Sequence, residues 1–127
     1  MTQTVYPVPR YRDARAAIEF LERSFGFEPV SVTEGEGDAI VHAELDVGAG
    51  LIMLSSTSDD DPFPAGPSTL YVAVQDPDAH HDRAKGAGAE IVMELTDQPY
   101  GSREYAARDP EGNVWCFGTY RPQPPGG

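Results

Sequence analysis

The chain has 127 residues, of which 39% are hydrophobic and 24% charged, a composition typical of one ordinary globular domain. Its formal net charge of -12 predicts that nucleic acid is not a partner, because phosphates would be repelled, whereas a cationic ligand is compatible with it. A single cysteine cannot form an internal disulfide, so we expect a cytoplasmic protein. No signal peptide and no apolar run of roughly 20 residues is present, so no membrane association is expected.

In chain order, the first half predicts a strand, a helix and three more strands. The apolar run Val5–Tyr11 favours a strand, and Asp13 is a typical helix N-cap. Apolar residues at helical spacing follow Asp13, and Gly26 is a helix stop signal. The later strands are expected at about Glu28–Thr33, Ala39–Leu45 and Gly50–Thr57.

The second half repeats this order. After the apolar strand Thr69–Gln75, Asp76 and Pro77 are the N-cap and first position of a second helix, which Gly86 or Gly88 ends. The remaining strands are expected at about Ala89–Leu95, Ser102–Arg108 and Val114–Tyr120, the last of them after the turn residues DPEGN.

One step of 63 residues relates the two halves: it takes Asp13 to Asp76, Asp46 to Asp109 and Met53 to Cys116. The step indicates two tandem modules within a single domain of residues 1–127. We expect module one at about 4–57, a linker rich in Asp, Pro, Gly and Ser at 58–68, and module two at about 69–120. The tail 121–127 is expected to be poorly ordered.

The third strand of the first half alternates between small apolar and polar residues. Its odd-numbered residues form an apolar face suited to packing under a helix, so Ile40, His42 and Glu44 are expected on the opposite face. A shift by 63 residues places Arg103 and Tyr105 on the matching face of the seventh strand. A half-polar face of this kind predicts a wet cleft.

The tandem βαβββ order resembles the vicinal oxygen chelate superfamily, which includes glyoxalase I, extradiol dioxygenases, and the fosfomycin and bleomycin resistance proteins. The segments that carry the resemblance are RDARAAIEFLERSFGFEP, VQDPDAHHDRAKGAGAEI and YGSREYAARDPEGNVWCFGTY, and the DPEGN turn is the most specific of their motifs. The resemblance implies an α+β fold in which the two modules form an incomplete barrel around a ligand cleft, with the helices on the convex sides.

Metal-dependent members of that superfamily place one ligand, usually His, Gln or Glu, on each of four strands. The resemblance puts Tyr6, Met53, Leu70 and Cys116 at these positions. Zinc requires a tetrahedral set of N, S or O donors and harder cations require oxygen, so these side chains form no credible metal site. We therefore expect neither a metal nor another cofactor, and we interpret the four side chains as cleft lining.

Individual roles follow from residue type. Cys116 is interpreted as a small buried hydrophobe, and the alternative, a nucleophile, would require a lowered thiol pKa. His42 and Glu44 form the best polar pair, for ligand binding or for acid–base catalysis. Arg103 is a candidate clamp for an anionic group, and Tyr105 is a candidate for stacking or hydrogen bonding.

Other aromatic residues are assigned to packing or to the surface. Trp115 and Phe117 are expected to pack against the helices, on the face away from the cleft. His80 and His81 are adjacent on a helix and do not share a face, so we expect them on the surface and not as a metal clamp. Tyr100, in a loop, is a candidate for the cleft mouth.

These features favour metal-independent binding of a small organic molecule. Sequestration of a toxic or cationic compound, and hence antibiotic resistance, is implied by the resemblance only. The alternative is an enzyme of the same superfamily, a lyase, isomerase or dioxygenase-like protein that is metal-free or has an unrecognised site, for example with His42 as base. A regulatory or scaffold module is a third class. Bleomycin-binding members form their clefts between two subunits, so the resemblance also implies a homodimer.

Overall fold

The structure, a computed structural model, describes residues 3–63, 66–123 and 125. Module one contains β1 (Arg10–Tyr11), α1 (Ala14–Phe25), β2 (Glu28–Glu34), β3 (Ile40–Asp46) and β4 (Leu51–Ser56). Module two contains β5 (Thr69–Ala73), α2 (Pro77–Gly86), β6 (Glu90–Asp97), β7 (Arg103–Arg108) and β8 (Val114–Gly118). The βαβββ order of each half confirms the α+β fold that the sequence predicts.

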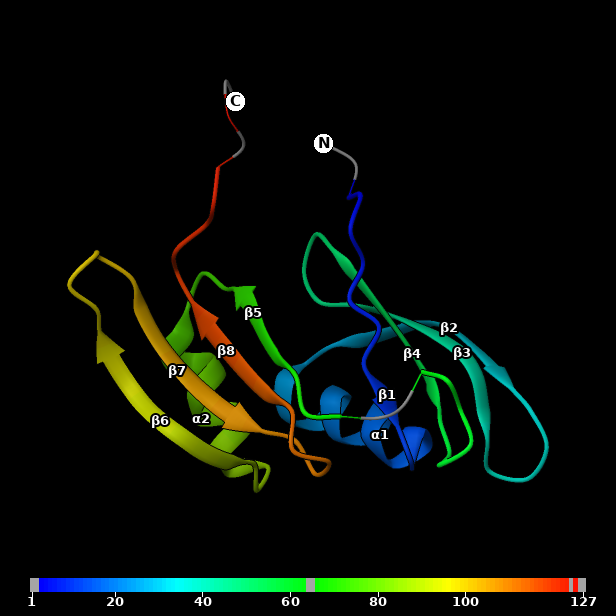
Figure 1. Ribbon diagram of the computed structural model, residues 1–127. Helices are drawn as coiled ribbons and strands as arrows, with labels where there is room; N and C mark the ends of the chain where they lie inside the picture. The colour runs from blue at the N-terminus through cyan, green and yellow to red at the C-terminus, as the bar shows by residue number, and fades with distance from the viewer. Residues whose placement is uncertain (1–2, 64–65, 124, 126–127) are drawn as a thin grey trace.

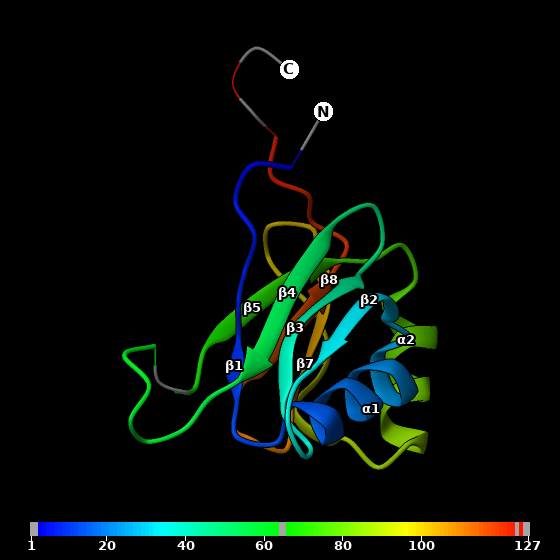
Figure 2. The same cartoon turned by 90° about the vertical axis from the view of Figure 1, so that its right-hand side faces the viewer.

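Each module forms one four-stranded sheet. The strand orders are β1-β4-β3-β2 and β5-β8-β7-β6, with the β1–β4 and β5–β8 pairs parallel and the other pairs antiparallel. The two sheets lie side by side with β1 and β5 as their inner edges, and they do not close into a barrel (Figure 1). Both helices lie on one side of the sheets (Figure 2), which leaves a helix-free face on the other side.

The helices begin where the sequence predicts. The Asp13 side chain accepts a hydrogen bond from the Ala16 backbone N–H (3.1 Å), and the Asp76 side chain accepts one from the Ala79 N–H (3.1 Å). Gly26 ends α1 in the left-handed conformation that glycine adopts at low cost. Within the described residues, neither helix is long and apolar enough to cross a membrane.

The first strand is shorter than the predicted run Val5–Tyr11. Only Arg10 and Tyr11 form a regular parallel ladder, with Ser55 and Ser56 of β4. Pro7 and Pro9 precede them and have no backbone N–H to donate, which interrupts the ladder. The segment still follows β4, because Pro7 accepts a hydrogen bond from the Met53 backbone N–H (3.0 Å).

The two modules share one hydrophobic core. Phe25 at the end of α1 packs on Phe117 of β8 with ring centroids 4.7 Å apart, and Phe27 packs on Trp115 at 5.4 Å. Both Trp115 and Phe117 are fully buried. Their predicted packing on the helix side is confirmed, but Trp115 also borders the groove described below and so does not lie away from the cleft as predicted. Part of the predicted disordered tail, residues 124, 126 and 127, lies outside the described residues.

A β-bulge changes the predicted faces of β3. The ladder with β2 pairs His42 with Thr33 and Ile40 with Glu34, so Val41 is the extra residue. At the N-terminal end of β3, the extra residue reverses the alternation of buried and exposed side chains. Ile40 is 2% exposed and lies in the core, whereas Val41 is 61% exposed. The prediction that Ile40 shares a face with His42 is therefore wrong.

The faces of β7 also differ from those expected by the step of 63 residues. In module one, Asp46 pairs with Leu51 across a four-residue connection, 47–50, whereas Arg108 pairs with Val114 across the five residues 109–113. The longer turn moves β7 by one position relative to β3. Tyr105 consequently pairs with Phe117 and faces the helices. The expectation that Arg103 and Tyr105 share the helix-free face is wrong for this reason.

The two adjacent histidines of α2 are not on the surface as predicted. His81 is buried, and its Nε2 hydrogen-bonds to Glu94 (2.7 Å). The His80 ring packs on Phe117 with centroids 4.1 Å apart, and Nδ1 of His80 hydrogen-bonds to the Tyr105 hydroxyl. The expectation failed because α2 packs on β7 with this part of its surface, so both rings are enclosed.

Candidate functional site

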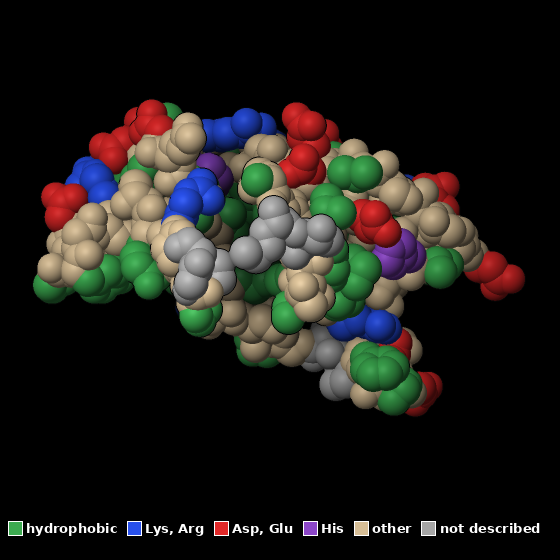
Figure 3. All heavy atoms as spheres, turned by 90° about the horizontal axis from the view of Figure 1, so that it is seen from above, with side chains coloured by type: hydrophobic (Ala, Val, Ile, Leu, Met, Phe, Trp, Pro, Cys, Tyr) green, Lys and Arg blue, Asp and Glu red, His purple; other side chains and the backbone are tan. Residues whose placement is uncertain are grey.

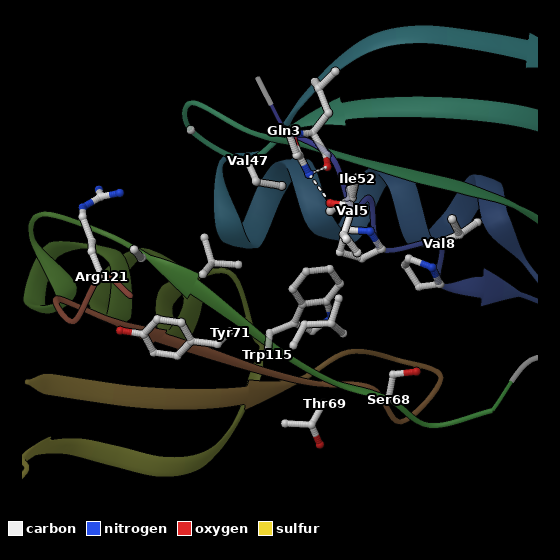
Figure 4. Close-up of a pocket in the computed structure, with 17 residues that line it drawn as sticks. Gln3, Val5, Val8, Val47, Ile52, Ser68, Thr69, Tyr71, Trp115 and Arg121 are labelled. Atoms are coloured by element: carbon white, nitrogen blue, oxygen red, sulfur yellow. Dashed lines mark hydrogen bonds between the residues drawn. The ribbon is translucent and has the colours of Figure 1, made fainter. Parts of the chain in front are cut away.

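A groove of about 600 Å³ runs between the inner edges of the two sheets. One wall comes from module one: Gln3, Val5, Pro7, Val8, Pro9, Val47, Gly48, Leu51 and Ile52. The other wall is the strand segment from Ser68 to Ala73, with Arg121 near one end. Trp115 lies at the middle of the groove, between β5 and the N-terminal segment (Figure 4). The site is therefore mainly apolar, with few polar groups.

The N-terminal wall is held in place by one amide side chain. Gln3 Nε2 donates to the Leu51 carbonyl (2.8 Å), and Gln3 Oε1 accepts from the Leu51 N–H (2.7 Å), so the side chain imitates a paired strand residue. Tyr6 supports the same segment, because its hydroxyl donates to the Gln3 carbonyl (2.9 Å). Tyr6 is thus placed behind the wall, and it is not among the side chains that line the groove.

On the helix-free face of the first sheet, the predicted polar pair comes together. His42 Nε2 lies 2.9 Å from Glu44 Oε2, and both side chains are partly exposed. Glu44 pairs across the ladder with Met53 of β4, so these three predicted residues form one surface. They flank the groove and do not line it. Their roles in binding or catalysis stay predictions.

The corresponding face of the second sheet carries Cys116. It lies between Tyr71 of β5 and Ala106 of β7 in the ladder, and Glu104 is the next residue of β7 on this face. Burial, and then the charge of Glu104, raise the pKa of the Cys116 thiol. A nucleophile needs the opposite shift, so the geometry favours the interpretation of Cys116 as a packed thiol.

Arg103 and Tyr105 lie on the other side of the second sheet. The Arg103 guanidinium bonds Asp78 through Nε (2.7 Å) and Nη2 (3.2 Å), and Asp97 through Nη1 (3.1 Å). These bonds raise the pKa of Arg103 and leave it committed to two carboxylates. Tyr105 is 0% exposed, and burial raises the pKa of its hydroxyl. Neither residue lines the groove.

Of the four residues predicted at the ligand positions of metal-dependent relatives, Met53 and Cys116 have strand neighbours other than Tyr6 and Leu70. Tyr71 is the direct neighbour of Cys116, and the hydrogen bond from Met53 to Pro7 places Val8 beside Met53. Leu70 instead pairs with Trp115 and belongs to the floor of the groove. Val, Met, Tyr and Cys do not supply the donors of a divalent-metal site. In the part of the chain that the structure describes, no group of three His, Cys, Asp or Glu side chains is arranged to hold a metal ion.

Glu104 is the polar residue that the sequence reasoning missed. It is 8% exposed, and its Oε1 accepts a hydrogen bond from the Tyr100 hydroxyl (2.8 Å). The signal that reveals it is the length of the turn before β8, which moves Glu104 onto the face that Tyr105 was expected to occupy. Tyr100 lies in a loop at the edge of this surface, where it was predicted to be near a cleft.

The surface around the groove differs in character from the groove itself. Viewed from the end at which the N- and C-terminal segments lie, hydrophobic side chains occur in the middle of the face and also along its lower edge (Figure 3). Asp and Glu side chains lie mainly along its outer rim. A mainly apolar lining with a few polar groups is the usual composition of a small-molecule site.

The comparison with known proteins identifies the family. The family model described as Glyoxalase/Bleomycin resistance protein/Dioxygenase superfamily matches residues 6–117. An uncharacterised protein of Mycobacterium bovis is 32% identical over 118 residues, which cover 84% of this chain and 76% of that protein.

Solved structures agree with this match. TioX from Micromonospora sp. ML1 is 35% identical, with a TM-score of 0.78 over 93% of this chain and 100% of that chain. A bleomycin-binding protein complexed with bleomycin has a TM-score of 0.68 over 94% of this chain and 100% of that chain, at 20% identity, which shows likeness of fold alone. The chain belongs to the glyoxalase/bleomycin resistance protein/dioxygenase superfamily.

Proposed function

We propose that this protein binds a small, largely apolar organic molecule in the groove between its modules, without a metal ion. The observation that carries the proposal is the groove itself, which at about 600 Å³ has the size of a ligand site and is lined mainly by apolar side chains. Tyr71 also lines the groove and is 39% exposed, so its ring offers a surface on which a planar ligand can stack. The bleomycin-binding neighbour provides a precedent for ligand binding on this fold.

Metal independence is supported by Met53 and Cys116, two of the predicted ligand positions, together with their strand neighbours. Val8, Met53, Tyr71 and Cys116 offer a thioether, a phenol and a thiol whose pKa is raised, which is no ligand set for Zn²⁺, Mn²⁺ or Ni²⁺. Addition of these ions is expected to leave the melting temperature unchanged, since a ligand stabilises only the state that it binds. A clear increase in melting temperature with any of them would contradict the proposal.

The binding test uses Trp115, which is the only tryptophan of the chain. Its fluorescence is expected to change on titration with neutral aromatic compounds, and the compound should be recovered chemically unchanged at a 1:1 ratio. Val5→Arg places a charge in the groove wall at an 81% exposed residue and should weaken binding. Val41→Arg, at a 61% exposed residue outside the groove, is the matched control. Equal binding by both variants would place the ligand elsewhere.

The hydrogen bond between His42 and Glu44 favours a second candidate, an enzyme with His42 as general base. A carboxylate that orients an imidazole is a common arrangement in proton transfer. This candidate predicts turnover of the compound, and His42→Ala should abolish it. Binding with full recovery of the compound, unaffected by His42→Ala, would reject this candidate and support sequestration.

We also propose that the chain forms a homodimer. β2 is an edge strand that is exposed along its whole length, and Val30 and Val32 on it are exposed apolar residues. Edge strands with apolar side chains readily pair with another chain. Light scattering is expected to give twice the chain mass, and Val32→Lys should convert the dimer to a monomer. A monomeric wild-type protein would contradict this proposal.

A further inference from the structure

Glu104 is a buried carboxylate without a cationic partner. Its side chain is 8% exposed, and among the described residues it takes part in no salt bridge. Arg121, a basic residue beside Tyr71 at the groove, forms no ion pair with it. Enclosure of an ionised carboxylate without a countercharge is unfavourable. Glu104 is therefore a candidate partner for a cationic ligand.

Three tyrosines form a connected cluster beside this carboxylate, and one of them hydrogen-bonds to it. Tyr100 donates its hydroxyl hydrogen to Glu104 Oε1 (2.8 Å), and its ring meets that of Tyr120 edge to face with centroids 6.3 Å apart. Tyr71 donates to the Tyr120 carbonyl (2.7 Å), which closes the cluster on the side of the groove. All three rings are more than a third exposed, so an incoming group can reach them.

Gly118 makes this close approach possible. A Cβ atom at this position would lie 2.5 Å from Glu104 Cγ and 2.8 Å from the Tyr71 hydroxyl oxygen. Distances below 3 Å are not tolerated between such atoms, so any side chain here would displace the carboxylate or the phenol. The β8 backbone thus allows Glu104 and Tyr71 to lie against the same spot of the sheet. Glu104 Oε2 makes no hydrogen bond to another described residue.

We propose that Glu104 and the tyrosines Tyr71, Tyr100 and Tyr120 bind the cationic ammonium group of an organic ligand. Tyrosine faces attract ammonium groups through the ring quadrupole, and the attraction strengthens when the cation is desolvated. The free oxygen of Glu104 supplies the opposite charge. A metal ion is a poor occupant, because one carboxylate and phenols whose pKa values are raised give too few anionic donors.

The inference rests on the proposed function and adds the chemical class of the ligand. Tyr71 belongs both to the tyrosine cluster and to the wall of the apolar groove, so one molecule can place its apolar part beside Trp115 and its ammonium group at Glu104. The preferred ligand would then be an amphipathic amine. The acidic net charge of -12 favours the approach of such a cation.

The test compares choline with its neutral isostere, 3,3-dimethyl-1-butanol, by NMR titration of the full chain. Choline is expected to shift the resonances of Tyr71, Tyr100 and Tyr120 and to bind at least tenfold more tightly than the alcohol. Glu104→Gln keeps the shape and the acceptor for Tyr100, and it should remove this preference. Glu36→Gln, which removes one charge from an exposed loop, is the matched control and should retain it.

Variants at Tyr100 test the same site in case Glu104→Gln alters folding. Tyr100→Leu changes a 63% exposed side chain and should weaken choline binding severalfold, whereas Tyr100→Phe keeps the ring and should preserve it. Equal affinity for choline and the alcohol, or choline binding that survives Glu104→Gln, would overturn the inference.

The neutral aromatic titration of Trp115 separates the two proposals. If Glu104→Gln loses choline but still binds the neutral aromatic compound, both proposals stand. If wild-type protein binds the aromatic compound and shows no preference for choline, the groove proposal stands and the cation site is rejected. If choline binds selectively and no neutral aromatic compound binds, the proposed groove function fails.

Discussion

Asp109 accepts five hydrogen bonds, more than any other described carboxylate. Its Oδ2 accepts from the Tyr11 hydroxyl (2.6 Å), the Asn113 amide (3.0 Å) and Trp115 Nε1 (3.0 Å). Its Oδ1 accepts from the backbone N–H groups of Glu111 (3.0 Å) and Asn113 (3.1 Å). Burial and the neighbouring Asp109 charge raise the pKa of Tyr11, so the phenol stays a donor. One side chain thus joins the two modules and fixes the turn before β8.

Asp109→Ala is expected to lower the free energy of unfolding by about 3–4 kcal/mol, because it leaves several buried donors without an acceptor. Asp46→Ala is the control, since Asp46 is the repeat equivalent and its exposed side chain bonds only the Gly48 N–H (2.7 Å). The control should cost less than about 1 kcal/mol. Urea unfolding measures both values, and similar losses would refute the importance of the network.

His80 makes the stability depend on pH. Burial lowers the pKa of His80 from 6.5 to about 4, because the ring lies among Phe25, Phe117 and Tyr105. The unfolded chain therefore takes up a proton at a higher pH than the folded protein does. The contribution of neutral His80 is fully present above pH 6.5 and is lost as the pH falls from there toward 4.

We expect this loss to be about 1–2 kcal/mol, since the ring is only partly buried. Urea unfolding at pH 7.5 and pH 5 measures it. His80→Gln should reduce the pH dependence, and His42→Gln, on the open face of the first sheet, serves as control. An unchanged pH dependence in His80→Gln would show that other groups cause it.

The two helices are joined at the end of α1. Arg83 of α2 donates to the carbonyls of Glu22 (3.0 Å) and Arg23 (3.2 Å) in the last turn of α1, and the Glu22 carbonyl also accepts from the Gly26 N–H (3.1 Å). Gly26 follows with φ of 74°, and a Cβ atom there would lie 2.8 Å from Arg83 Nη1. The close approach of the arginine therefore depends on glycine.

Gly26→Ala is expected to cost about 2 kcal/mol, from the left-handed backbone together with displacement of Arg83. Gly37→Ala is the matched control, because Gly37 has φ of 61° and no atom within 4 Å of the added Cβ. The control should show only the backbone cost of about 1 kcal/mol. Thermal unfolding compares the variants, and equal losses would mean that the Arg83 contact contributes nothing.

Helix positions were predictable from the sequence, because an Asp cap, an amphipathic repeat and a glycine stop are local signals. It was not predictable which residues of β3 and β7 face the helices. Alternation of residue types cannot reveal that Val41 is the bulged residue, since the bulge depends on the pairing with β2. A repeat step likewise misplaces Tyr105 when one turn is longer by a residue. His42, Glu44 and Met53 were grouped correctly because no irregularity separates them.

The groove depends on how the whole molecule assembles, and sequence reasoning therefore identified few of its residues. The side chains of Val5, Ile52 and Trp115 become neighbours only when the two sheets meet. The sequence of each module alone predicts strands and a helix and does not indicate a cavity. Of the predicted cleft residues, Leu70 lines the groove, while Cys116 and the His42–Glu44 pair lie on the adjoining faces.

The shared core predicts that neither module is stable alone. Phe25 and Phe27 would lose their contacts with Trp115 and Phe117 in fragments 1–57 and 69–127. Each fragment is expected to give the NMR spectrum of an unfolded chain. In the intact protein, Trp115 fluorescence and far-UV circular dichroism should change together in one transition. A separately folded fragment, or two distinct transitions, would contradict this expectation.

The extra residue in the turn 109–113 has a consequence for recognition. With turns of equal length, Tyr105 would be the counterpart of His42 on the helix-free face. The displaced register instead sets an imidazole, His42, in one half and a carboxylate, Glu104, at its counterpart in the other. A single added residue thereby exchanges a phenol for a carboxylate on this face, so the two halves of a duplicated framework offer different charges to the head and the tail of a molecule.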